Sequence, residues 1–288
     1  VLSLAPGRRR APSLPVDVAR TIEQALTDVP LDVVHVHEPF APSAGSVALR
    51  HSRALNVATF HEPTERLLTT QLTRPLSRHL FGRLDARVTS FRATRELLQA
   101  YFPGRYEVIL PGADVVEPAS DSGPIRLLAC AAEDRGAMRV FLRALRALPE
   151  ELDWEAAVWT REPWRLPATL SARLRRRLRV LEGESVPEAQ ALAEADVLVL
   201  ASEGARPSPA TLVGALAAGM PIVASRLPIY EELLGDGEYG LQFELGDAQT
   251  LTAHLGRLIA EPALRRRDPE RARRLRALFS WERAAAEV

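Results

Sequence analysis

Short apolar runs alternate with amphipathic stretches along most of this 288-residue chain. Continuous apolar runs predict buried strands, and apolar residues spaced three or four apart predict helices. Residues 1–14 show no such pattern. The first half predicts strands at 32–37, 56–60, 86–91 and 106–110, and helices at 16–26, 41–52, 64–80 (with a break at Pro75) and 94–101. This alternation predicts parallel βαβ winding.

The alternation is interrupted once and then resumes. Residues 111–124 are rich in proline, glycine, serine and aspartate, which is typical of a linker. Predicted strands follow at 125–130, 154–159, 179–181, 197–200, 221–224 and 240–243, and predicted helices at 139–148, 170–178, 187–194, 210–218, 229–234, 248–260 and 263–279. We therefore expect two α/β domains, residues 1–115 and 116–280, followed by residues 281–288 as a short final segment.

The amino-acid composition of the chain limits the classes of protein to which it can belong. Hydrophobic residues make up 47% of the chain, and the formal net charge is 0, which gives no general attraction to nucleic acid. The chain has no lysine, so arginine supplies its permanent positive charge. The single cysteine, Cys130, excludes an internal disulfide and favours a reducing compartment. Without an apolar run of ~20 residues or a signal peptide pattern, we expect a cytoplasmic protein.

The most informative stretch is LASEGARPSPATLVGALAAGMPIVAS, residues 200–225. It predicts the end of a strand, a loop, a helix, a tight turn and a second strand. Ser208 and Pro209 suit the N-cap and the first position of the helix, and Gly219 suits a left-handed end. Parallel α/β proteins bind phosphate where a helix begins beyond the carboxyl end of a strand. The stretch therefore predicts a phosphate-binding loop.

The second half of this stretch, from Ala215 to Ser225, resembles the donor-binding segment of family 4 glycosyltransferases. Three earlier segments are similar to segments of the same family, and of phosphatidylinositol mannosyltransferases in particular: DVVHVHEPFAPSAG (32–45), VATFHEP (57–63) and VILPGADV (108–115). Their order and spacing identify the chain as a member of the family. The resemblance implies a GT-B fold, which has two Rossmann-like domains with parallel sheets, the second binding a nucleotide sugar.

The resemblance also implies differences at the two ends of the chain. Family members begin with two strands and a glycine-rich loop, and here the sequence starts after them. We expect a fragment or a mis-assigned start, with a naturally reduced domain or a partner chain that supplies the strands as alternatives. Residues 281–288 resemble a remnant of the family's crossover helix.

Several donor-site residues of the family are replaced here. Two glutamates, eight residues apart, bind the sugar and the ribose in the family. Aligned from Gly219, their positions hold Arg206 and Gly214. Glu203 is a candidate substitute for the first glutamate. Ser208 is expected to cap the helix, and backbone N–H groups between Ser208 and Thr211 remain candidates for holding phosphate.

The pyrophosphate-binding cations of the family are also altered. In the family an arginine ends the first strand of the second domain, and a lysine-glycine pair follows five or six residues later. Arg135 and Gly136 match the lysine-glycine pair, and Cys130 or Ala129 falls at the arginine position. Arg135 could bind phosphate bidentately, or it could be a solvated residue at a helix start. Cys130 is expected to be a buried strand thiol.

Histidines mark two predicted strand ends in the first domain. The resemblance implies that His61 lies near the donor sugar as a catalytic residue, and the alternative is a loop histidine bonded to backbone. His35 and His37 share a strand face, and imidazoles bind zinc, but the expected third ligand spacing is missing. We expect packing there, no metal and no cofactor. Glu38 is expected in the catalytic cleft.

Two arginine groups allow a membrane hypothesis. One is the run from Arg173 to Arg179, and the other comprises Arg66, Arg74, Arg78 and Arg83 around a leucine-rich segment. Each predicts a solvated face or, as the alternative, peripheral contact with the inner surface of a membrane.

The resemblance leads to two functional hypotheses. The first is a glycosyltransferase that transfers a hexose from a nucleotide-diphosphate sugar to a sugar or lipid hydroxyl with retention. The second is a catalytically inactive homologue, a scaffold or a gene fragment. Neither hypothesis involves nucleic acid.

Overall fold

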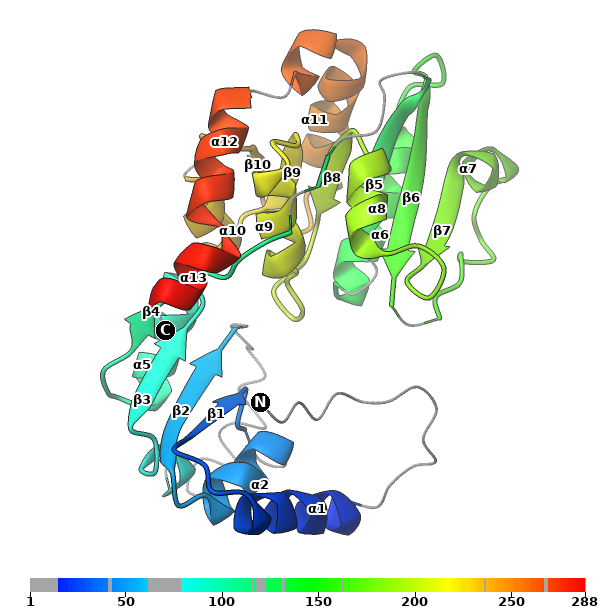
Figure 1. Ribbon diagram of the computed structural model, residues 1–288. Coiled ribbons are helices and arrows are strands. Elements are labelled where there is room, and N and C mark those ends of the chain that lie inside the picture. Colours follow the sequence, from blue (N-terminus) through cyan, green and yellow to red (C-terminus); the bar gives the residue numbers. More distant parts are fainter. Residues whose placement is uncertain are drawn as a thin grey trace. The chain divides into compact units, whose positions relative to one another are not determined.

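The computed structural model in Figure 1 describes residues 15–40, 43–61, 79–114, 116–117, 123–130, 133–161, 163–235, 237–266 and 269–287. The chain divides into two compact units. Unit 1 comprises Val1–His61, Arg66–Thr89 and Leu98–Glu107, and unit 2 comprises Glu62–Glu65, Ser90–Leu97 and Val108–Val288. Both contain parallel strands connected through helices, so the predicted α/β class is confirmed.

Unit 1 is built around a four-stranded sheet in the order β1-β2-β3-β4. Its elements are α1 (Pro15–Asp28), β1 (Val33–His37), α2 (Ala44–His51), β2 (Leu55–Phe60), β3 (Ala86–Thr89), the C-terminal part of α5 (Arg92–Tyr101) and the start of β4 (Glu107–Val108). The strands predicted at 86–91 and 106–110 are shorter in the structure. The predictions for residues 1–14 and for most of the helix at 64–80, including Pro75, lie outside the described residues.

Aromatic side chains form much of the core of unit 1. Phe60 and Phe81 lie with ring centroids 5.3 Å apart, and Phe81 and Phe102 lie 4.3 Å apart. On β1, Val34 and Val36 are buried in this core while the alternate positions are exposed, as the two-residue repeat of a strand requires. The opposite face of β1 therefore carries His35 and His37.

Unit 2 contains a six-stranded sheet in the order β10-β9-β8-β5-β6-β7, with parallel pairing throughout (Figure 1). The strands are β5 (Ile125–Cys130), β6 (Trp154–Thr160), β7 (Leu178–Glu182), β8 (Val197–Leu200), β9 (Ile222–Ser225) and β10 (Leu241–Phe243). The helices are α6 (Arg135–Ala147), α7 (Ala172–Arg177), α8 (Glu188–Glu194), α9 (Pro209–Ala217), α10 (Pro228–Leu234), α11 (Ala248–Ala260), α12 (Pro269–Leu278) and α13 (Trp281–Glu287). Counted from β5, this is the 3-2-1-4-5-6 order of dinucleotide-binding folds.

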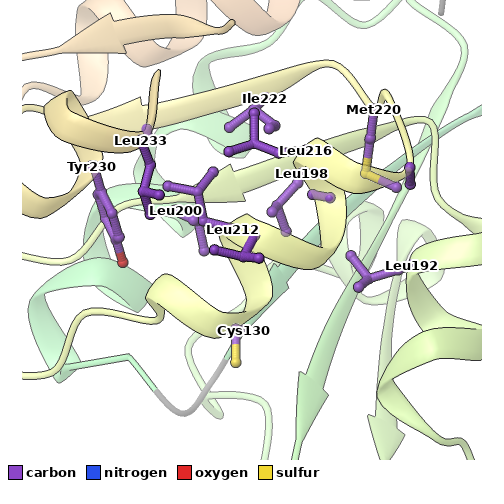
Figure 2. Close-up of a cluster of buried hydrophobic side chains, with 14 of the residues drawn as sticks. Cys130, Leu192, Leu198, Leu200, Leu212, Leu216, Met220, Ile222, Tyr230 and Leu233 are labelled. Carbon is purple, nitrogen blue, oxygen red and sulfur yellow. The ribbon is translucent and has the colours of Figure 1, made fainter. Parts of the chain in front are cut away.

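Helix α9 has apolar residues all round because it is covered on several sides. It packs against α8, α10 and α12 as well as β8. Figure 2 shows the cluster, in which Leu212 and Leu216 of α9 lie among Leu198, Leu200 and Ile222 of the sheet. Cys130 belongs to the same cluster and is 2% exposed, which confirms the predicted buried strand thiol.

Two helix predictions need correction. The helix predicted at 263–279 is interrupted: a 3₁₀ turn spans Pro262–Arg265, and α12 starts at Pro269. Proline lacks the N–H that a continuing helix needs, so it favours a new start. The helix predicted at 139–148 begins earlier, at Arg135, because the Asp134 carboxylate accepts a hydrogen bond of 2.8 Å from the Ala137 N–H and caps it.

Candidate functional site

The strand order of unit 2 reverses between β5 and β8, so the segments that follow these two strands meet at the same edge of the sheet. Asp134 connects these two segments through hydrogen bonds. Its Oδ2 accepts hydrogen bonds from the Ser202 hydroxyl at 2.6 Å and from the Glu203 N–H at 2.9 Å, while its Oδ1 caps α6. Burial opposes ionisation, but these hydrogen bonds hold the pKa of Asp134 below its ordinary value.

A second carboxyl group supports the same loop from inside the protein. Glu133 is buried, and its oxygens accept hydrogen bonds from the Tyr230 hydroxyl at 2.5 Å and the Ala201 N–H at 2.9 Å. Burial raises the pKa of Glu133 to about 8 despite these bonds. Tyr230, labelled in Figure 2, also accepts the Ser208 N–H at 2.7 Å. The loop before α9 is thus held on a buried polar network.

No local sequence pattern pointed to Glu133, Asp134, Ser202 or Tyr230 as parts of the site. One signal was available, because Glu133 and Asp134 follow the first strand of unit 2 directly before a helix start. Acidic residues at that place commonly cap helices. The partner Tyr230 lies 97 residues further along the chain, and no local pattern connects the two.

The start of α9 differs from the prediction at Ser208. This residue occupies the N-cap position, but its side chain makes no capping hydrogen bond, so the predicted serine cap is wrong. Its backbone has φ −115° and ψ 65°, away from the extended conformation usual for a capping residue, and its N–H is directed to Tyr230. Pro209 at the first helical position is confirmed. Gly219, with φ 66°, confirms the left-handed end.

Thr211 does not leave its hydroxyl for a ligand. That hydroxyl donates to Oε1 of Glu188 in α8, and the other oxygen of Glu188 lies 3.0 Å from the Arg161 guanidinium. Arg161 also lies over the ring of Trp159, 5.4 Å from its centroid. These contacts connect the first turn of α9 to α8 and to the end of β6.

The remaining candidates lie around the starts of α6 and α9. Arg135 is exposed in the first turn of α6. Gly136 is buried beneath Glu203, and a Cβ atom there would collide with the Glu203 carboxylate. That carboxylate lies 3.7 Å from Arg139. The structure therefore brings Gly136 and Glu203 together.

Two positions lack the carboxylate side chains that the family resemblance implies. Arg206 is exposed in the loop before α9, where the family resemblance implies a carboxylate. Gly214, within α9, accommodates a Cβ atom, which would meet Leu192 Cδ1 at 3.4 Å. Cys130 and Ala129, the two positions at which the resemblance would place a phosphate-binding arginine, are both buried and uncharged, so no charge reaches the loop from either position.

The second group of candidates lies in unit 1, at the carboxyl ends of β1 and β2. His61 follows β2, and its Nε2 lies 2.7 Å from Nδ1 of His37 at the end of β1. The Glu38 carboxylate accepts the His61 N–H at 2.6 Å. Burial, then the neighbouring His37 and His35, lower the pKa of His61. Within the described part of the chain, no three histidine, cysteine, aspartate or glutamate side chains form a group suited to a metal ion.

Arginines of the run from Arg173 to Arg179 in unit 2 donate hydrogen bonds to backbone carbonyl groups of the protein. Arg175 donates to the carbonyl groups of Pro167, Ala168 and Leu170, and Arg177 donates to Leu152 at 2.8 Å. In unit 1, Arg83 similarly binds carbonyl groups at the end of α2. Arg66, Arg74 and Arg78 lie outside the described residues. Among the helices described here, none combines the length and apolar character needed to span a membrane.

The chain has two units with parallel sheets, and the second sheet has the strand order of a dinucleotide-binding fold. This combination is the GT-B architecture. Comparison with known protein families leads to the same assignment. The profile of glycosyltransferase family 4 matches residues 2–117, and that of group 1 glycosyl transferases matches residues 125–261. Together the two profiles span most of the chain, which therefore carries a family 4 glycosyltransferase domain followed by a group 1 glycosyl transferase domain.

Individual relatives support the assignment. The chain is 29% identical to a phosphatidyl-myo-inositol mannosyltransferase of Mycolicibacterium smegmatis over 285 residues, which cover 93% of this chain and 72% of the relative. Two solved structures show the same fold: sucrose-phosphate synthase from Thermosynechococcus elongatus (TM-score 0.74, 16% identity, 93% of this chain and 75% of that one) and Anabaena HepE in complex with UDP-glucose (0.73, 17%, 94% and 80%). The predicted family and the predicted GT-B fold are confirmed.

Proposed function

We propose that this chain is a retaining hexosyltransferase that binds a nucleotide-diphosphate sugar at the carboxyl edge of the sheet in unit 2. The observation that supports it is the junction of the segments after β5 and β8 at the reversal of strand order, where Asp134 joins the start of α6 to the loop before α9. In open α/β sheets, ligands bind at such a reversal. Backbone N–H groups at the helix starts would face the diphosphate.

The names of the relatives suggest the acceptor class. The Mycolicibacterium smegmatis relative is a phosphatidyl-myo-inositol mannosyltransferase, and the Anabaena structure contains UDP-glucose. For this chain we propose a sugar or lipid hydroxyl as acceptor, with peripheral contact at a membrane surface when the acceptor is a lipid. The reaction would exchange the bond between the sugar carbon and the diphosphate oxygen for a bond to the acceptor oxygen.

The proposed roles follow from the charges and positions of the residues. Arg135 would balance charge that develops on the leaving diphosphate, a form of stabilisation that often supplies the largest part of catalysis. His61 would contact the donor sugar, with Glu38 holding its main chain. We propose no metal or cofactor for this transfer.

A second candidate is a non-catalytic homologue, and specific residues favour it. Gly214 has no carboxylate, Arg206 has the opposite charge, and Cys130 is buried as a thiol. Removing a single group that stabilises a transition-state charge typically costs ~2.7–4 kcal/mol. We therefore expect transfer by this chain to be weak or absent even where donor binding persists.

Calorimetry with a panel of UDP- and GDP-sugars separates the two candidates. Micromolar binding, together with transfer or hydrolysis that His61→Ala abolishes, supports the enzyme and excludes the inactive homologue. Absence of binding by a protein whose circular dichroism shows it folded excludes the enzyme. The matched control is His254→Ala, which changes a histidine of α11 in the same way.

A further inference from the structure

A small pocket lies in unit 2, where the linker after β4 meets the last helices of the chain. Its volume is about 170 Å³. Drug-sized ligands usually occupy pockets of ~300–1,000 Å³, so this pocket suits a single small ring. It is lined by Ala113 and Asp114 of the linker, Ala217 at the end of α9, Arg276 of α12, and Trp281 and Glu282 of α13.

Trp281 is the aromatic residue of this lining, and its ring is held in place by two contacts. The indole N–H donates to Asp114 Oδ1 at 3.0 Å. Gly112 packs so closely against the ring that a Cβ atom there would lie 2.4 Å from Cδ2. Trp281 is nevertheless 56% exposed. The ring therefore offers an apolar surface in a fixed orientation, which lowers the entropic cost of binding a ligand.

The other segments around the pocket are also bonded to one another. The Ala113 N–H donates to the Phe279 carbonyl group at 2.8 Å, which joins the linker to the end of α12. Arg276 donates from Nε to the Ala217 carbonyl group at 2.9 Å, and its Nη1 lies 3.1 Å from a Glu117 carboxylate oxygen. These two contacts use two of the five N–H groups of the guanidinium. The lining is thus already formed without a ligand.

The chemistry of the lining limits the class of ligand. The carboxylates of Asp114 and Glu282 disfavour an anion, and the guanidinium of Arg276 disfavours a cation. An apolar molecule would take these charged groups out of water without giving hydrogen bonds in return. A neutral sugar meets all the requirements, because its hydroxyl groups can donate to carboxylates and accept from a guanidinium. Its C–H groups can pack on the ring of Trp281.

The pocket is separate from the proposed donor site. Ala217 is the last residue of α9, whereas the proposed donor loop precedes Pro209, the first residue of the same helix. At about 1.5 Å per residue, the two ends of this helix lie about 12 Å apart. A sugar in the pocket would therefore not be the sugar that the donor transfers.

We propose that the pocket beside Trp281 binds one neutral hexopyranose unit, with the C–H face of the sugar on the indole ring and its hydroxyl groups on Asp114, Arg276 and Glu282. It is a second carbohydrate site besides the proposed donor site. Binding there does not depend on whether the chain binds a nucleotide sugar.

The test uses the full chain labelled with ¹⁵N-tryptophan, whose four indole N–H groups give signals in a ¹H–¹⁵N correlation spectrum. Trp281→Phe removes one signal and so identifies that of Trp281. The probes are methyl α-D-mannopyranoside and methyl α-D-glucopyranoside. We expect at least one of them to shift the Trp281 signal saturably, with a Kd of about 1–10 mM, as suits so small a ligand. The signals of Trp154, Trp159 and Trp164 should not move.

Glu282→Ala removes a carboxylate of the lining and leaves the bond between Trp281 and Asp114 intact. It should weaken hexoside binding about tenfold or more, because a hydrogen bond to a charged group is lost. The matched control is Glu151→Ala, which changes an exposed glutamate before β6 and should leave the affinity unchanged. Glycerol and adenosine should give no saturable shift of the Trp281 signal.

Four results would overturn the proposal. They are a Trp281 signal that neither hexoside shifts, a response to glycerol equal to the response to the hexosides, a saturable response to adenosine, and an unchanged hexoside affinity in Glu282→Ala. The spectra require no nucleotide sugar, so a failure of donor binding would count against the proposed function and not against this second site.

Discussion

The Tyr230 hydroxyl donates a hydrogen bond of 2.5 Å to the Glu133 carboxyl group, across 97 residues of sequence. The same oxygen accepts the Ser208 N–H, so one phenol connects α10, the start of α6 and the start of α9. Both side chains are buried. The loop before α9, which the proposed donor would contact, is therefore supported by the buried, ionisable carboxyl group of Glu133.

This burial predicts a pH-dependent stability. The pKa of Glu133 is about 8 in the folded protein, against 4.5 for the ordinary group, so the folded state retains a proton that the unfolded state has released. The stability that the protonated Glu133 carboxyl group contributes to the fold is fully present below pH 4.5 and is lost as the pH rises toward 8. Each pKa unit corresponds to about 1.4 kcal/mol. Glu133→Gln should therefore gain stability relative to the unsubstituted protein by a few kcal/mol between about pH 5 and pH 8.

Urea unfolding at several pH values measures this difference. Glu184→Gln changes an exposed glutamate in the same way and should follow the unsubstituted protein at every pH. Parallel pH curves for Glu133→Gln and the unsubstituted protein would contradict the assignment of the pH dependence to Glu133.

Asp134 should matter more than an ordinary helix cap. Replacing a capping aspartate by alanine typically costs about 0.5–2 kcal/mol. Here the Ser202 hydroxyl and the Glu203 N–H lose their acceptor as well, so Asp134→Ala should reach or exceed the upper end of that range. Ser171→Ala, at the cap of α7, is the control: it removes a single capping hydrogen bond, from the Leu174 N–H, and should cost less. Equal losses of unfolding free energy would show that the loop contacts of Asp134 contribute nothing.

Gly112 should not tolerate alanine. A Cβ atom there would overlap the Trp281 ring, lying 2.6 Å from Cε3, and the indole N–H is fixed on Asp114 at 3.0 Å. Gly112→Ala should cost about 1–3 kcal/mol, as overpacking usually does, and should alter tryptophan fluorescence. Gly256→Ala, in α11 where a Cβ meets nothing within 4 Å, should instead stabilise by about 0.5–1 kcal/mol. Unchanged stability and fluorescence in Gly112→Ala would mean that Trp281 moves aside freely.

Restoring a carboxylate at Gly214 tests the donor site directly. The position is helical, and a Cβ atom there would have Leu192 Cδ1 as its nearest neighbour, at 3.4 Å, so the backbone accepts a side chain. A hydrogen bond to a charged group is worth about 1.5–3 kcal/mol, so Gly214→Glu should strengthen nucleotide-sugar binding about tenfold or more in calorimetry. Gly214→Ala controls for the gain in helix propensity. Equal affinities of the two variants would place residue 214 outside the donor site.

The order of strands and helices could be predicted from the sequence because it depends on local periodicity. The predicted helix at 248–260 coincides with α11, and the Pro209 start and Gly219 end of α9 follow from single-residue conformational preferences. The family was also identifiable, because short motifs in order along one chain carry that information. Ser208 was one exception at this level, since its N–H is bound by the distant Tyr230.

Side-chain partners, by contrast, depended on the tertiary structure. Sequence indicated Glu38 and His61 separately, but only the register of β1 against β2 joins His61 to both His37 and Glu38. Likewise, nothing local connects Glu133 to Tyr230. The physical reason is range: backbone preferences act over a few residues, whereas burial, pKa and hydrogen-bond partners depend on segments that meet only when the sheets form.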